Sequence, residues 1–146
     1  MLYELAAALG GAFVAAQIAM NGQTRMVLGG PLWAALANNI VGLAGLSLAL
    51  LATGASWPGM AGVRLVHPLH WAAGLLGAAF IVMSAWVGPR LGLATTFVLV
   101  LAGQLGASLM IDHFGLFTGT PRPANPDILL GVCLVFFGAL LVVRAR

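Results

Sequence analysis

Three polar side chains recur at four-residue intervals in an apolar, glycine-rich stretch of the sequence. Residues 101–115 read LAGQLGASLMIDHFG. Gln104, Ser108 and Asp112 share one stripe of a helix over this segment, because residues four apart lie on the same helical face. Amide and hydroxyl groups can bind a polar solute, and a carboxylate can bind a cation or a proton. These three side chains could therefore recognise a solute or couple transport to an ion.

Two other apolar stretches carry side-chain amides. Gln17 and Asn21 lie four residues apart, and Asn38 and Asn39 interrupt a second apolar run. Polar groups in hydrocarbon need partners, so we expect these faces to point into a helix bundle or a wet cavity. Hydrogen bonding between helices, worth about 0.6 kcal/mol each, is one interpretation. A lined substrate path is the other, and we favour it because three helices contribute polar stripes.

Aromatic residues add one candidate to this path. Trp71 and Trp86 bracket one apolar run, and both fit anchors at the membrane interfaces. One of them could instead wall a pocket. The predicted substrate-binding residues are Gln17, Asn21, Asn38, Gln104, Ser108 and Trp71.

Two carboxylates are candidates for ion coupling, Asp112 and Glu4. A charged Asp at the centre of a membrane helix costs roughly 2.5–3.5 kcal/mol, but Asp112 ends its apolar run, where water is near. It could fix the following loop through backbone N–H groups around Gly115, pair with an Arg, or couple transport to an ion. Glu4 stands at the very start of the first apolar run.

The sequence contains little that indicates a metal site, a cofactor site or an enzyme active site. His67 and His70 lie three residues apart, but Pro68 separates them and no carboxylate or thiolate is close in sequence, so we interpret them as interface residues. Ser108, Asp112 and His113 share a segment without forming a catalytic relay. A nucleophile elbow, a metal-ligand set and a phosphate-binding glycine loop are all missing from the sequence. We therefore predict no metal, no cofactor and no enzyme activity.

The elements that position these residues follow from the composition. Of the 146 residues, 62% are hydrophobic and 6% are charged, whereas soluble domains carry about 25% charged residues. Stretches of at least 20 uncharged residues separate Glu4, Arg25, Arg64, Arg90 and Asp112 from one another in turn. About 20 apolar residues cross a bilayer as a helix. The sequence therefore predicts an all-α, multi-pass integral membrane protein in contact with the lipid bilayer.

Pro and Gly clusters divide the chain into five spans within a single transmembrane domain, residues 1–146. The predicted spans are about 2–20, 32–51, 69–87, 91–111 and 128–143. An odd number of spans puts the termini on opposite sides, with Arg25, Arg90, Arg144 and Arg146 on one side and Arg64 and Arg122 on the other. The side with more Arg is predicted to be cytoplasmic. Because the bias is small, a dual topology is open to this chain.

Four segments together resemble one known family. They are GAFVAAQIAMNGQTR, PLWAALANNIVGLAGLSLALL, WAAGLLGAAFIV and GQLGASLMIDHFG. They are similar to the YdcZ-like family, small five-helix proteins of the bacterial inner membrane in the drug/metabolite transporter superfamily. The resemblance implies half of a ten-helix transporter fold. The four-helix small multidrug-resistance proteins of that superfamily bury a Glu within their first helix, and the position of Glu4 departs from this pattern.

The functional prediction is a small-molecule transporter that works as a dimer. Amides with few carboxylates suggest a neutral or weakly cationic solute. The dimer is expected to be an antiparallel homodimer or a heterodimer with a relative. The alternative is a non-transporting membrane subunit that stabilises or regulates a partner protein. The net charge of +3 arises from so few charges that it does not indicate nucleic-acid binding.

Overall fold

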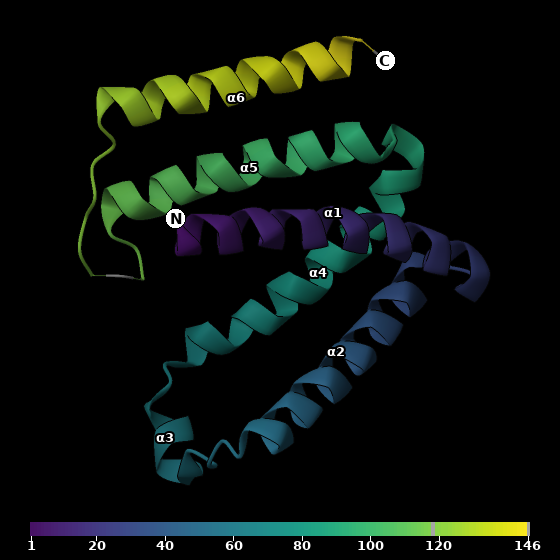
Figure 1. Ribbon diagram of the computed structural model, residues 1–146, viewed down its shortest axis with the longest axis vertical. Coiled ribbons are helices and arrows are strands. Elements are labelled where there is room, and N and C mark those ends of the chain that lie inside the picture. The colour runs from purple at the N-terminus through teal and green to yellow at the C-terminus, as the bar shows by residue number, and fades with distance from the viewer. Residues whose placement is uncertain (118, 146) are drawn as a thin grey trace. The chain divides into compact units, whose positions relative to one another are not determined.

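The computed structural model describes residues 1–117 and 119–145, and all regular structure in this part of the chain is helical. Arg146, counted above for the topology, lies outside the described residues. Five helices are long and apolar enough to cross a membrane, which confirms the predicted all-α membrane fold. They are α1 (Leu2–Leu28), α2 (Pro31–Thr53), α4 (Pro68–Leu91), α5 (Leu93–Phe114) and α6 (Pro126–Arg144), shown in Figure 1.

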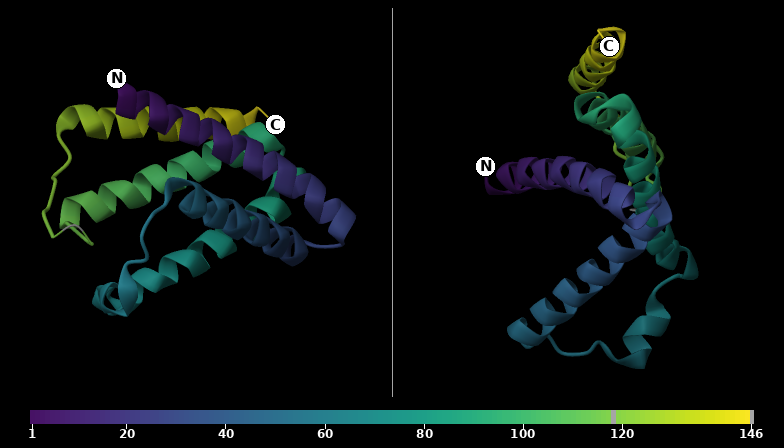
Figure 2. Two further views of the ribbon diagram at one scale, coloured as in Figure 1. Left: turned by 60° about the horizontal axis from the view of Figure 1, so that its bottom comes forward. Right: turned by 90° about the vertical axis from the view of Figure 1, so that its right-hand side faces the viewer.

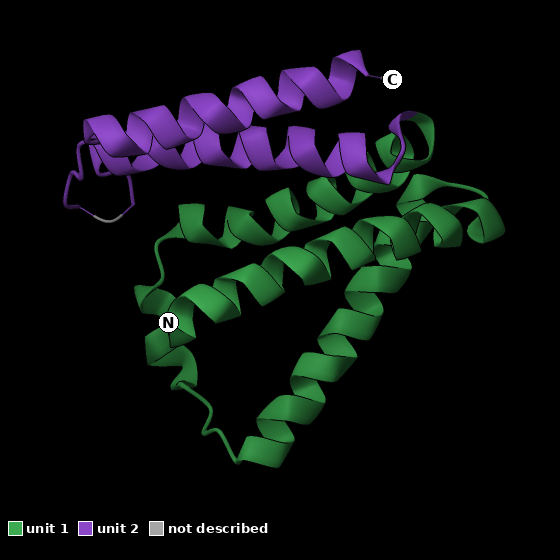
Figure 3. Ribbon diagram, turned by 45° about the horizontal axis from the view of Figure 1, so that its top comes forward, with its two compact units in different colours: residues 1–90 green, residues 91–146 purple. Residues whose placement is uncertain are grey.

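The chain divides into two compact units, residues 1–90 and 91–146 (Figure 3). In the first unit α1 packs against α2, and α4 follows. A short helix, α3 (Gly59–Leu65), lies between α2 and α4, in a segment where the sequence predicts a loop. In the second unit α5 packs against α6.

Glycine and proline set the helix ends in the first unit. α1 extends beyond residue 20, the predicted end of the first span, and ends at Leu28. Gly29 follows it in a left-handed conformation with φ of 79°. Pro31 then begins α2, because the first helical position needs no N–H donor. At a rise of about 1.5 Å per residue, Glu4 and Arg25 lie about 30 Å apart along α1, the thickness of the hydrocarbon core.

Pro89 explains how α4 is held against α1. Proline has no N–H, so the carbonyl of Ala85 four residues earlier loses its helical donor. Arg25 of α1 occupies the vacated position, with Nη1 at 3.5 Å from the Ala85 oxygen and 3.1 Å from the Trp86 oxygen. One turn before Arg25, a Cβ on Gly22 would lie 3.3 Å from Cγ of Pro89. A glycine therefore lets α1 approach the proline ring closely.

Very few side chains are buried, as expected for helices that face lipid. The largest fully buried side chain among the described residues is Ile18, and most other buried apolar residues are alanines. Large apolar side chains are instead exposed, for example Val41 (71%) and Leu75 (75%). A soluble protein rarely exposes so large an apolar area. This surface is suited to hydrocarbon.

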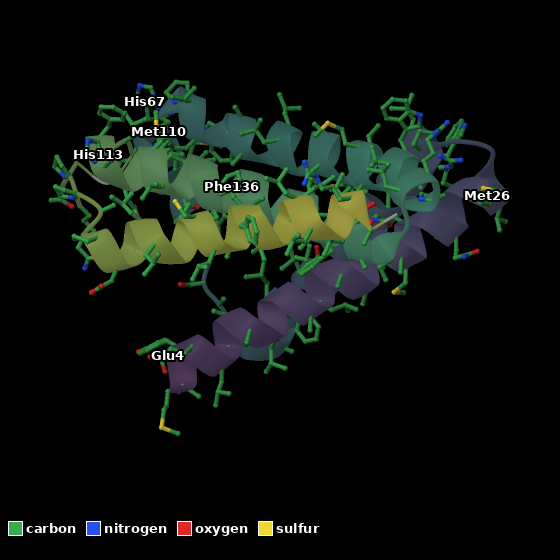
Figure 4. The ribbon with its side chains drawn as sticks, turned by 90° about the horizontal axis from the view of Figure 1, so that it is seen from above. Glu4, Met26, His67, Met110, His113 and Phe136 are labelled. Carbon is green, nitrogen blue, oxygen red and sulfur yellow. The ribbon has the colours of Figure 1, made fainter. Side chains whose placement is uncertain are left out.

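The second unit is held together by small residues and a defined loop. A Cβ on Gly106 of α5 would lie 3.5 Å from Cζ of Phe136 on α6, the aromatic residue labelled in Figure 4. Asn125 caps the N-terminus of α6, since its side-chain oxygen accepts a hydrogen bond from the Ile128 N–H at 2.8 Å. Gly115, which has φ of 63°, caps the C-terminus of α5.

Replacing Gly115 with Ala should destabilise the protein more than the same change at Gly119. Both glycines have positive φ, but a Cβ at Gly115 would lie 2.7 Å from the Pro121 nitrogen, whereas nothing lies within 4 Å at Gly119. The clash should cost roughly 2 kcal/mol beyond the backbone strain that both variants share. Thermal unfolding of the purified variants measures the difference. Equal decreases in melting temperature would show that the close contact at Gly115 does not affect stability.

Candidate functional site

Three side-chain amides meet between α1 and α2. Gln17 Nε2 donates to Asn38 Oδ1 at 3.5 Å, and Asn38 Nδ2 donates to Asn21 Oδ1 at 3.1 Å. We call these residues the amide cluster. Asn38 is its centre, since it donates to one helical neighbour and accepts from the other. Gln17 and Asn21 face α2 together because they are one turn apart on α1.

One donor of the amide cluster has no partner. Asn21 is only 4% exposed, and its Nδ2 is buried without a hydrogen-bond partner in the described part of the chain. A buried donor left unpaired costs about 1–3 kcal/mol. The structure therefore keeps a costly group at this position, and an acceptor supplied by a bound molecule would satisfy it.

The amide cluster lines a groove of about 630 Å³ between α1 and α2. The helices diverge from their connection at Gly29 and Gly30 (Figures 1 and 2). Phe13 and Met20 from α1 and Val41 from α2 give the groove apolar walls. Its described lining contains no charged side chain. Apolar walls with a few polar groups are typical of small-molecule sites.

Asn39 differs from its neighbour Asn38. Its Nδ2 donates to the Ala35 carbonyl of its own helix at 2.8 Å, and it does not line the groove. The two adjacent asparagines thus separate into one that joins α1 to α2 and one that bonds only within α2.

The amide cluster lies toward one end of the helices rather than midway. Gln17 and Asn21 are about 12 Å and 6 Å from the level of Arg25 along α1, given a rise of about 1.5 Å per residue. Figure 4 shows Glu4 and Met26 at opposite ends of α1, so the cluster is on the Met26 side. Glu4 forms an exposed ion pair with the N-terminal ammonium at 2.5 Å.

The other predicted substrate-binding residues are not part of the amide cluster. Trp71 is 58% exposed on α4 and does not line the groove. Gln104 and Ser108 lie on α5 in the second unit, where both are exposed.

Asp112 holds the loop after α5 through its main chain. Its carbonyl oxygen accepts hydrogen bonds from the N–H groups of Gly115 at 3.2 Å and Arg122 at 2.7 Å. Its carboxylate is exposed and has no ion-pair partner among the described residues. The segment that the sequence singled out for its acidic side chain therefore uses a backbone oxygen to order the loop.

His67 and His70 lie with their ring centroids 5.9 Å apart, and His67 Nδ1 accepts a hydrogen bond from the Leu69 N–H at 3.2 Å. Within residues 1–117 and 119–145, His, Cys, Asp and Glu side chains form no group of three that could hold a metal ion.

A pair of arginines was not anticipated from the sequence. Arg25 and Arg90 both donate to the Trp86 carbonyl oxygen, at 3.1 Å and 2.6 Å. The guanidinium of Arg90 also lies 5.0 Å from the centre of the Trp86 ring. The sequence signal in this region is Pro89, which frees the Ala85 carbonyl that Arg25 also contacts.

Comparison with known proteins agrees with this fold. The family model described as "Putative inner membrane exporter, YdcZ" matches residues 2–141, nearly the whole chain. The chain belongs to the YdcZ family. The inner membrane protein YdcZ of Escherichia coli (strain K12) is 38% identical over 90 residues, which cover 59% of this chain and 60% of that protein. No solved structure matches the chain.

Membership of the YdcZ family confirms the resemblance seen in the sequence and places the chain in the inner membrane as a multi-pass protein. The family description supports a role related to membrane transport rather than catalysis.

Proposed function

We propose that this chain is a small-molecule transporter of the inner membrane, and that its amide cluster binds the solute. The buried, unpartnered Nδ2 of Asn21 carries this proposal. A bundle that needed only contacts between helices would not require a buried donor beside a groove of about 630 Å³. The family description of an inner membrane exporter agrees with this role.

The solute class follows from the groove. Asn21 Nδ2 calls for a hydrogen-bond acceptor, such as a hydroxyl, ether or carbonyl oxygen. The apolar walls favour a molecule that also has an apolar part, and the described lining offers no side-chain charge to neutralise a strong ion. We therefore propose a neutral or weakly cationic, amphiphilic solute.

We further propose that the chain works as an antiparallel homodimer. α1 and α2 leave their groove open, and every residue of α2 from Asn39 to its end is exposed, so a second copy could close the path. Opposed copies would reproduce the inverted repeats that are common in transporters. Because the amide cluster lies toward the Arg25 end of α1, such a dimer would have one cluster near each membrane face.

Thermal unfolding of the purified protein with a panel of metabolites and drugs tests the binding proposal. At 100 times its Kd, a ligand stabilises the folded state by about 2.7 kcal/mol. We expect stabilisation by neutral or weakly cationic amphiphiles. A panel of such compounds that stabilises nothing, when the protein itself unfolds cooperatively, would favour a subunit that supports a partner protein instead.

Asp112→Asn should leave solute uptake and stability largely unchanged. The loop after α5 depends on the Asp112 main-chain carbonyl, which the substitution keeps. An exposed carboxylate without an ion-pair partner contributes little to stability, so we expect a change in unfolding free energy within about 0.5 kcal/mol. Uptake into liposomes at several pH values provides the check. If the variant lost a pH dependence that the wild type shows, Asp112 would be a coupling residue, and Glu4→Gln, measured in parallel, tests the other candidate.

A further inference from the structure

The two arginines that share the Trp86 carbonyl line a second recess, away from the amide cluster. It has a volume of about 460 Å³ and is lined by Arg25, Met26, Gly29, Gly30, Pro31, Trp86 and Arg90. We call it the corner cleft, because it lies where α1 turns into α2 and where α4 ends. None of the residues that line the groove also lines the corner cleft.

The corner cleft concentrates positive charge. Arg25 and Arg90 are brought together by one oxygen atom, the Trp86 carbonyl. Glu4, the only acidic residue in the sequence of the first unit, stands at the opposite end of α1. Arg25 has no carboxylate partner among the described residues, and its recorded contacts are to carbonyl oxygens and the Met26 sulfur. Two neighbouring guanidinium groups repel each other, so an anion between them would stabilise the arrangement.

The guanidinium groups are also held in a defined orientation. Arg25 is half-buried and donates to the Ala85 carbonyl, which Pro89 leaves without a helical donor, and to the Trp86 carbonyl. Arg90 is tied to the same Trp86 carbonyl and lies over the Trp86 ring. A guanidinium carries five N–H donors, so at Arg25 these bonds leave donors for a ligand. Arg groups fixed in this way bind phosphate oxygens in pairs, with stronger bonds than neutral donors make.

The level of the corner cleft agrees with a membrane interface. It lies about one hydrocarbon thickness from Glu4 along α1, and Trp86, an interfacial residue type, forms one wall. Anionic lipid headgroups gather near basic pockets between helices at such an interface. In the proposed antiparallel dimer, one corner cleft would lie at each membrane face.

We propose that the corner cleft binds a phosphate group, supplied by the headgroup of an anionic phospholipid. The phosphate would lie between the two guanidinium groups, with the acyl chains along the exposed apolar faces of the adjoining helices. A soluble phosphate-bearing molecule has the same binding chemistry and is the other source to be tested.

Thermal unfolding of the purified full-length chain distinguishes these sources. We expect phosphatidylglycerol in mixed micelles to raise the melting temperature by about 5 °C or more over phosphatidylcholine. Inorganic phosphate, compared with chloride at equal ionic strength, should have no such effect. The gain should be lost in Arg90→Gln and kept in Arg64→Gln, which removes an arginine of α3 that does not line the cleft.

Arg25→Lys is a control for loss of folding in the charge-removing variants, because it keeps the positive charge and removes only the planar guanidinium group. We expect it to retain part of the lipid effect, between wild type and Arg90→Gln. Stabilisation by inorganic phosphate that is lost in Arg90→Gln would support the phosphate site with a soluble ligand. Equal responses to both lipids, or a lipid gain that survives in Arg90→Gln and Arg25→Gln, would overturn the proposal.

Discussion

Asn38→Leu is expected to lower the affinity for the transported solute at least tenfold, while Asn39→Leu leaves it unchanged. Asn38 donates to Asn21 and accepts from Gln17, so its loss leaves Gln17 Nε2 and Asn21 Oδ1 without these partners. The Asn21 amide would then be free to turn, and its Nδ2 would no longer be held in the position where we propose that it binds the solute. A tenfold loss corresponds to about 1.4 kcal/mol, within the cost of one misplaced hydrogen bond.

The two adjacent asparagines make a matched pair for this experiment. They are on the same helix with the same side chain, but Asn39 bonds only to the Ala35 carbonyl and lies outside the groove. Solute-dependent thermal stabilisation of both variants gives the affinities, and their melting temperatures without solute control for folding. Equal losses in the two variants would mean that the amide cluster has no special role in binding.

A cysteine added after Arg146 is expected to be labelled from both sides of the membrane when this chain is expressed alone. An antiparallel homodimer requires both orientations. The distribution of Arg between the two membrane sides opposes insertion in both orientations only weakly. In the structure, Arg25 and Arg90 lie together at one end of the first unit, and both belong to the side with more Arg. The experiment uses Cys133→Ala protein, because Cys133 on α6 is the single native cysteine of the sequence and its removal leaves the added cysteine as the one thiol.

A fixed-orientation variant provides the control for the topology experiment. Several Lys residues added at the C-terminus should hold that end in the cytoplasm and restrict labelling to one side. The same variant should lose transport when expressed alone. One-sided labelling of the unmodified chain would exclude the antiparallel homodimer and point to a heterodimer with a relative.

The helices could be predicted from the sequence because their cause is local. Long uncharged stretches require helices in a bilayer, and the Gly and Pro clusters between them mark the connections. The end of α1 is harder to predict. Residues 21–28 contain polar side chains that suggest a turn, yet they remain helical, and Gly22 and Arg25 among them contact the last turns of α4. Such contacts join residues about 60 positions apart, and no local pattern encodes them.

The candidate site was predictable in part. The polar stripes of α1 and α2 pointed to Gln17, Asn21 and Asn38, and the structure brings these side chains together. Sequence reasoning placed Asn38 and not Asn39 among the binding residues, and the structure gives these adjacent side chains different hydrogen-bond partners. Sequence reasoning gave the Asp112 carboxylate a possible functional role. The hydrogen bonds that order the loop are instead made by the Asp112 backbone oxygen, which every residue type possesses.

Solute uptake into liposomes that contain only this purified chain tests the transport proposal most directly. The solute is the compound that most stabilises the wild-type protein, and Asn38→Leu and Asn39→Leu are measured beside it. We predict saturable uptake by the wild type and by Asn39→Leu, and uptake reduced at least tenfold in Asn38→Leu at solute concentrations below the wild-type KM. Liposomes containing correctly folded protein that take up no more of this solute than empty liposomes would contradict a transporter.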